Sequence, residues 1–118
     1  MTINPMSADE TAEEREVRVW FSSRARDPEF LKEMAALATD LLRVRKARGP
    51  HTKARAQGDA IVLWNREEKT VVPKTRWKYF VDRGYISKTE PPSISPGGAR
   101  MLKLYAYLIS QAREAALM

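Results

Sequence analysis

The sequence predicts a mainly α protein with a small β part, an α+β fold built as a single domain. Two observations favour this fold class. Long segments repeat apolar residues at helical spacing and are bounded by capping residues, Pro or Gly. Between them lie short apolar segments with β-branched residues, which are typical of strands. The chain has 118 residues, 43% of them hydrophobic, which is enough for one core.

Positive charge is concentrated toward the C-terminal end of the sequence. The chain carries 21 bases and 15 acids, a net charge of +6. Residues 1–42 hold nine acids and five bases, whereas residues 43–118 hold sixteen bases and six acids. This asymmetry indicates a part that binds polyanions joined to a helical part that is neutral or acidic. The alternative is a basic but inert surface, because many small soluble proteins have a high pI.

Several classes of protein are disfavoured by what the sequence lacks. It has no cysteine, which excludes disulfides and thiolate metal sites. Its first residues, MTINPMSADETAEERE, contain no basic segment followed by an apolar run, so we expect no signal peptide. No apolar run approaches the ~20 residues of a membrane span. We therefore expect a cytoplasmic protein, nucleoid-associated if it binds DNA, with no membrane partner.

The first helix is expected to follow a flexible tail over residues 1–7. Ser7 and Glu10 match a capping box, in which each side chain bonds the backbone amide of the other residue. Acidic residues crowd the first turn, as the helix dipole prefers. We therefore expect a helix over residues 8–24 with one buried face.

The second helix has a clear start in Asp27-Pro28. An Asp side chain caps free amides, and Pro fits the first helical position because it needs no donor there. Its apolar residues cover more than one stripe, so the helix is expected to pack on both sides. We expect it to run to about Ala47 and to be ended by Gly49-Pro50.

Residues 43–55, RVRKARGPHTKAR, hold six bases and no acid. Part of this run complements the C-terminal end of the second helix, and the remainder is expected to be an exposed basic loop. Its functional interpretation is a set of phosphate contacts; a solvated surface loop is an equal alternative. The candidate nucleic-acid-binding residues here are Arg45, Lys46, Arg48, Lys53 and Arg55.

Residues 60–72 allow two interpretations. The run AIVLW, a turn over residues 65–68 and a returning strand would form a β-hairpin, which the β-branched content favours. A short helix with Ile61 and Trp64 facing inward is the alternative, favoured by the helix that follows. Periodicity does not separate these for so short an apolar run.

A third helix is expected from Val72 to Gly84. Pro73 suits its start, and Gly84 suits its end because glycine tolerates positive φ. Trp77, Phe80 and Val81 share one helical face and are expected to be buried. Polar and basic residues occupy the remaining positions.

Two short strands and a last helix complete the chain. Tyr85-Ile86 begins the first strand, and Ile94 lies in the returning one. Ser95-Pro96 caps a helix over residues 96–117. Its apolar residues are spaced 4-3-4-3, a seam compatible with a second subunit; packing on its own domain is the better interpretation. The seam residues are Met101, Tyr105, Leu108, Ala112 and Ala115.

The segments VVPKTRWKYFVDRGYI and SISPGGARML resemble the recognition helix, the wing strands and the C-terminal helix of winged helix-turn-helix DNA-binding domains. The resemblance covers Gly58 to Tyr105, less than half of the chain. It implies one domain over residues 8–118, with a helical part (8–48), a winged-helix-like core (58–105) and a long C-terminal helix (96–117). The chain departs from the family in a short, Pro-rich wing. A hairpin before Val72 would also remove the helix-turn-helix step.

A recognition helix buries one face and presents polar side chains to the major groove. Arg76 can bond a guanine edge with two donors, and Thr75 and Tyr79 can contact a phosphate or a base. Lysines are expected on phosphates, which fix the register without reading sequence. A solvated basic face is the alternative. The nucleic-acid-binding candidates of this segment are Lys74, Thr75, Arg76, Lys78, Tyr79, Arg83 and Lys88.

No pattern in the sequence indicates catalysis. His51 is the single histidine, and it stands in a basic loop. No metal-ligand spacing, Gly-rich phosphate loop or nucleophile motif is present. We expect no enzyme, no catalytic or metal residue, no cofactor and no small-molecule ligand.

The sequence thus predicts a sequence-specific binder of double-stranded DNA, a small prokaryotic or phage/plasmid transcriptional regulator. The alternative is a protein-interaction adaptor or inhibitor of the phage accessory type that uses the same basic face on an acidic partner. RNA binding is a third option without a supporting strand motif. A homodimer through the helical elements stays open.

Overall fold

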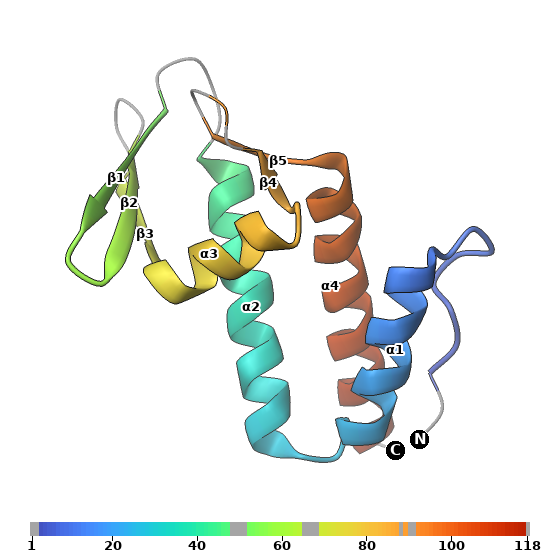
Figure 1. Cartoon of the computed structure of the whole chain (residues 1–118). Helices are drawn as coiled ribbons and strands as arrows, with labels where there is room; N and C mark the ends of the chain where they lie inside the picture. The colour runs from blue at the N-terminus through green and yellow to red at the C-terminus, as the bar shows by residue number, and fades with distance from the viewer. Residues whose placement is uncertain (1–2, 48–51, 65–68, 88, 90–91, 118) are drawn as a thin grey trace. The chain divides into compact units, whose positions relative to one another are not determined.

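A computed structural model describes residues 3–47, 52–64, 69–87, 89 and 92–117 (Figure 1). These residues form four helices and five short strands, so the predicted α+β fold is confirmed. The chain groups into two compact units, Met1–Ala38 with Met101–Met118, and Thr39–Arg100. We call them the helical unit and the mixed unit. They do not coincide with the expected parts of the single domain, because two long helices contribute residues to both.

The helical unit is built from α1 (Ala12–Arg24), the first half of α2 (Pro28–Lys46) and most of α4 (Pro96–Leu117). In its core Phe30 packs on Phe21, with ring centroids 5.5 Å apart. At the surface Phe30 meets Trp20, which is 43% exposed, edge-on at 4.8 Å. Phe21 is fully buried. Such aromatic pairs stabilise a core beyond the area they bury.

The N-terminal cap of α1 lies four residues later than predicted. Thr11 Oγ1 accepts from Glu14 N at 3.1 Å, and Glu14 Oε1 accepts from Thr11 N at 3.0 Å, which is a complete capping box. Ser7 instead accepts from Asp9 N. Glu10 is held by Arg18 at 2.6 Å. The expected Ser7–Glu10 box is therefore wrong, because Glu10 is used in this ion pair.

Ile3 and Asn4 are tied to helices of the same unit, unlike the flexible tail expected over residues 1–7. Ile3 is only 2% exposed, and its carbonyl accepts from Arg18 Nη1 at 2.8 Å. The Asn4 carbonyl accepts from the Tyr107 hydroxyl at 3.0 Å. The hydrogen bond to Glu10 raises the pKa of Arg18, although desolvation lowers it, so Arg18 stays charged while it holds this segment.

Helix α4 packs within its own chain, which was the preferred interpretation of its apolar seam, and not on a second subunit. Four residues of the predicted seam are at most 3% exposed, and Leu104, off the seam, is 1% exposed. Ala115 alone of the seam is exposed. A homodimer would have to use another surface. The four buried seam residues are Met101, Tyr105, Leu108 and Ala112.

Helix α2 begins as predicted, because Asp27 Oδ1 accepts from Glu29 N at 3.0 Å and Pro28 is the first helical residue. It ends at Lys46. The expected terminator, Gly49-Pro50, lies outside the described residues.

The mixed unit contains a three-stranded antiparallel sheet in the order β1 (Lys53–Gln57), β2 (Ala60–Trp64) and β3 (Lys69–Pro73). The hairpin interpretation of residues 60–72 is therefore confirmed, and the helix alternative is wrong. The expectation of a loop up to Arg55 is also wrong, since β1 pairs with β2 along its whole length. Three strands separate α2 from α3, so no tight helix-turn-helix step joins these helices.

The third helix, α3 (Lys74–Asp82), starts two residues later than predicted, because Val72 and Pro73 pair within β3 and Pro73 is the residue before the helix. Gly84 follows the end of the helix as predicted. Gly84 has a φ of 75°, Gly84 N donates to Val81 O, and Tyr85 N donates to Phe80 O. This is a Schellman motif, and the Phe80 and Tyr85 rings pack on each other as the motif favours. The motif turns the chain directly into the next strand.

The hairpin of β4 (Ile86–Ser87) and β5 (Ser93–Ile94) follows, with Ile86 opposite Ile94. Ser95 then caps α4, because its Oγ accepts from Gly98 N at 3.0 Å. The same hydroxyl donates to the Gly84 carbonyl. One side chain therefore links the end of α3 to the start of α4. The predicted pair of short strands and the predicted helix over residues 96–117 are confirmed.

Candidate nucleic-acid interface

The two units differ in charge. Residues 39–100, the mixed unit, carry fourteen bases and six acids, a net charge of +8. The helical unit carries seven bases and nine acids, a net charge of −2. The excess of positive charge in the second half of the sequence therefore belongs to one compact unit, which is where a polyanion would be attracted.

Helix α3 exposes part of the predicted recognition face. Lys74, Thr75 and Lys78 are exposed, and Phe80 is fully buried. Lys78 Nζ lies 3.0 Å from Asp82 Oδ2, with both side chains largely exposed. Such a surface pair is weak, so a phosphate could displace the carboxylate. Of the predicted buried face, Phe80 is in the core, and Trp77 and Val81 are half-buried.

Arg76 has a structural partner that the sequence did not indicate. Its Nη1 donates to Asp40 Oδ2 of α2 at 2.9 Å, and Arg43 donates to Asp40 Oδ1 at the same distance. Asp40 is only 4% exposed. A buried carboxylate without cationic partners is costly, so Arg76 joins α3 to α2. This role competes with the predicted contact to guanine.

Tyr79 and Arg83 lie together at the end of α3. The Arg83 guanidinium stands over the Tyr79 ring, 5.3 Å from its centroid. Tyr79 is half-buried and meets Phe80 and Tyr85 edge-on. A cation is attracted to the face of an aromatic ring, which orients it. Arg83 is therefore held at the C-terminal end of α3.

A second basic surface lies on one face of the three-stranded sheet. Directly paired residues of antiparallel strands point to the same face, and the register places Lys53 and Lys69 on either side of Trp64. Arg55 lies beside Val62 in the next row. We call this the basic sheet face. Its residues are Lys53, Arg55 and Gln57 of β1, Ala60, Val62 and Trp64 of β2, and Lys69, Val71 and Pro73 of β3.

The basic sheet face combines free cations with exposed apolar groups. Lys53, Arg55 and Lys69 are exposed and form no ion pair with any residue that the structure describes. Val71 is 44% exposed, and Trp64 is half-buried. The opposite face is packed at β2 and β3, where Leu63 and Val72 are at most 1% exposed, whereas the basic sheet face buries only Val62, at 5%. None of the nine residues of the basic sheet face is acidic.

The remaining predicted residues are divided between described and undescribed parts of the chain. Arg45 and Lys46 are exposed at the end of α2. Arg48 and Lys88 lie outside the described residues. The structure brings Lys53 and Arg55 together with Lys69, which sequence reasoning missed. The signal was the alternation in KARAQ before Gly58-Asp59, a two-residue hairpin turn with glycine first.

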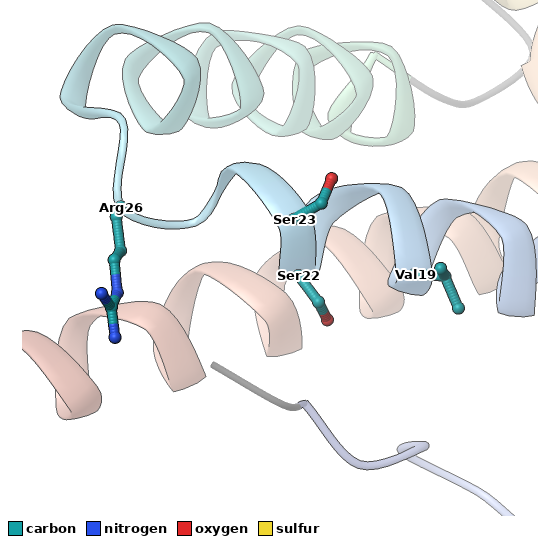
Figure 2. A pocket seen from close by; sticks show the side chains of 4 residues that line it. All are labelled: Val19, Ser22, Ser23 and Arg26. Atoms are coloured by element: carbon teal, nitrogen blue, oxygen red, sulfur yellow. The ribbon is translucent and has the colours of Figure 1, made fainter.

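A hollow on α1 offers a contrasting surface in the helical unit (Figure 2). It is lined by Val19, Ser22, Ser23 and Arg26. The two serines point to opposite sides of the helix. Ser22 donates to the Arg18 carbonyl, and Ser23 donates to the Trp20 carbonyl. Both hydroxyls are therefore satisfied within the helix, and the hollow holds no convergent set of polar groups of the kind that orients a ligand.

Within the described part of the chain, no three side chains of His, Asp or Glu gather in a way that could hold a metal ion. None of the described helices has the length and apolar character needed to cross a membrane. Comparisons of the chain with models of protein families, with curated proteins and with solved structures found no match. The residues of the mixed unit therefore provide the basis for a functional inference.

Proposed function

We propose that the chain binds double-stranded DNA through the mixed unit and acts as a small transcriptional regulator of a prokaryote, phage or plasmid. The observation that carries the proposal is the gathering of a net charge of +8 in one compact unit of 62 residues, Thr39–Arg100. Duplex DNA carries about one negative charge per 1.7 Å of its axis, and phosphate contacts supply most of nonspecific affinity. The proposal requires neither catalysis nor a cofactor.

Within this proposal, α3 and the β4–β5 hairpin match the recognition helix and wing of a winged helix-turn-helix domain in sequence order, and α3 contacts the DNA backbone. Lys74 and Lys78 contact phosphates, and Thr75 lies on the same exposed surface, within reach of a phosphate or a base. The sheet in front of α3 replaces the usual preceding helix. We therefore propose that α3 contacts DNA through its exposed residues Lys74, Thr75 and Lys78, whereas Arg76 stabilises the fold through Asp40.

An acidic protein partner is the second candidate function. The observation that favours it is the exposed apolar side chain of Val71 among the bases of the sheet. Protein interfaces combine an apolar centre with a polar rim. An adaptor of this kind would bind DNA weakly and without preference among fragments.

The test is fluorescence anisotropy of the whole chain with a pooled library of duplex fragments, at several salt concentrations and with random competitor DNA. We expect a few fragments to be retained against competitor, with an affinity that falls steeply as salt rises. Weak, equal binding of all fragments would contradict sequence-specific recognition and favour the adaptor.

The α3 assignment needs its own variant. Lys74→Ala combined with Lys78→Ala removes two exposed bases and leaves the Asp40 cluster intact. We expect the slope of log affinity against log salt to fall by about two, one for each phosphate contact. An unchanged slope would contradict a role of α3 at the interface.

A further inference from the structure

We propose that the basic sheet face is the surface that enters the major groove of duplex DNA, with α3 as a secondary contact. This inference rests on the proposed function and names the part of the unit that reads the DNA. It starts from the three cations Lys53, Arg55 and Lys69, which have no described ionic partner. On α3, by contrast, Arg76 is engaged by the buried Asp40, and Lys78 forms a weak surface pair with Asp82.

The width of the sheet suits the groove. β1 and β3 are the outer strands, and neighbouring strands lie about 4.8 Å apart, so the axes of the two outer strands are roughly 10 Å apart. The major groove of B-DNA is about 12 Å wide. Bases stand on both edges, Lys53 and Arg55 on β1 and Lys69 on β3. They are therefore placed to meet the phosphates of the two strands that border the groove.

Two apolar side chains of the face suit the floor of the groove. Half-buried Trp64 lies between the two lysines, and Val71, 44% exposed on the outer strand β3, lies in one row with Arg55 and with Val62, which is only 5% exposed. In the major groove an apolar side chain can contact the methyl group of thymine. Burial of Val71 and Trp64 against base edges would also remove apolar surface from water.

The arrangement favours a duplex over a single strand. Proteins that hold single strands line several aromatic side chains along one path for base stacking, whereas this face has one aromatic residue, Trp64. Lysines on edge strands also prevent sheets from pairing edge to edge. That role also depends on charge, but its loss would appear as self-association of the chain and not as a change in the salt dependence of duplex binding.

The experiment compares two triple variants of the whole chain that lose the same charge. The sheet variant is Lys53→Gln, Arg55→Gln and Lys69→Gln. The control variant is Lys32→Gln, Lys103→Gln and Arg113→Gln, three exposed bases on helices of the helical unit. Anisotropy with a retained duplex fragment is measured from 50 to 200 mM salt, and circular dichroism checks that each variant is folded.

We expect the sheet variant to lose on the order of tenfold or more in affinity and to lower the salt slope by about three, one for each phosphate contact. The salt slope of the control variant should differ from that of the unmodified chain by less than about one. Equal losses in both triples would overturn the assignment of the sheet while leaving DNA binding in place. No duplex binding by the unmodified chain would overturn the proposed function and this assignment with it.

Two further measurements test the assignment of the basic sheet face independently of the triple variants. If the sheet triple does not fold, Arg55→Gln alone should lower the slope by about one, and an unchanged slope would overturn the assignment. The same oligonucleotide is also measured as a single strand. Tighter binding of the single strand than of the duplex would overturn the choice of a duplex and indicate stacking on Trp64.

Discussion

At the scale of single residues, Gly98 has the least room for a side chain. A Cβ at this position would overlap the carbonyl oxygen of Tyr85 and press on Ile94, whereas a Cβ at Gly97 would lie 3.7 Å from Ser95 Oγ. We expect Gly98→Ala to lower the free energy of unfolding by about 1–3 kcal/mol, as overpacking does. Gly97→Ala should leave it unchanged or raise it by up to about 1 kcal/mol, since Ala favours helix. Urea denaturation measures both, and equal losses would contradict the close approach.

A second residue-scale comparison concerns the start of α1. Thr11 and Ser7 both precede a Glu by three residues, but only Thr11 makes the reciprocal hydrogen bonds of a capping box. We expect Thr11→Ala to destabilise the chain by about 1 kcal/mol. Ser7→Ala should change stability by less than about 0.5 kcal/mol, as surface substitutions do. A larger loss from Ser7→Ala in thermal or urea unfolding would show that the helix starts where the first pattern in the sequence placed it.

At the scale of elements, Asp40 is the polar link between α2 and α3. We expect Asp40→Ala to destabilise the chain by about 2–4 kcal/mol, because Arg76, 24% exposed, would lose its partner. Arg43→Ala should cost less than about 1 kcal/mol, since the Arg43 side chain is 48% exposed. Urea unfolding gives the order of these losses. If Arg43→Ala were the more costly, the Arg76–Asp40 pair would not be the link.

Elements that depend on local signals could be predicted from the sequence. Asp27-Pro28 and Ser95-Pro96 mark helix starts, and Gly84 marks a helix end, because the cap and the backbone conformation are set by a few adjacent residues. β1 was missed because KARAQ has no β-branched residue, and its strand conformation comes from pairing with β2. The Arg76 contact was missed for a similar reason, as Asp40 is 36 residues away in the sequence.

The candidate site was predictable in part. Lys53 and Arg55 were identified by their charge, but their common face with Lys69 follows from the sheet register, which the sequence left open between hairpin and helix. If residues 60–72 had formed a helix, Lys53, Arg55 and Lys69 would not share one face of a sheet. Thus charge indicated the segment, and only tertiary pairing defined a surface with bases on two edges and apolar groups between them.

At the scale of the whole molecule, charge follows the two compact units. The sequence changes from acidic to basic at about residue 42, close to the boundary of the mixed unit at Thr39. The return of α4 to the helical unit was not indicated by charge, and it rests instead on the buried residues of its apolar stripe. A unit of net charge +8 is expected to attract DNA at a rate that falls with ionic strength.

The most direct measurement is the salt dependence of duplex binding by the unmodified chain. Three bases of the sheet face and two of α3, Lys74 and Lys78, are assigned to phosphates, so log affinity should fall with log salt with a slope of about −4 to −5. That result, with a few fragments retained against competitor, would support a DNA-binding regulator. A slope near zero, or no binding at low salt, would contradict it.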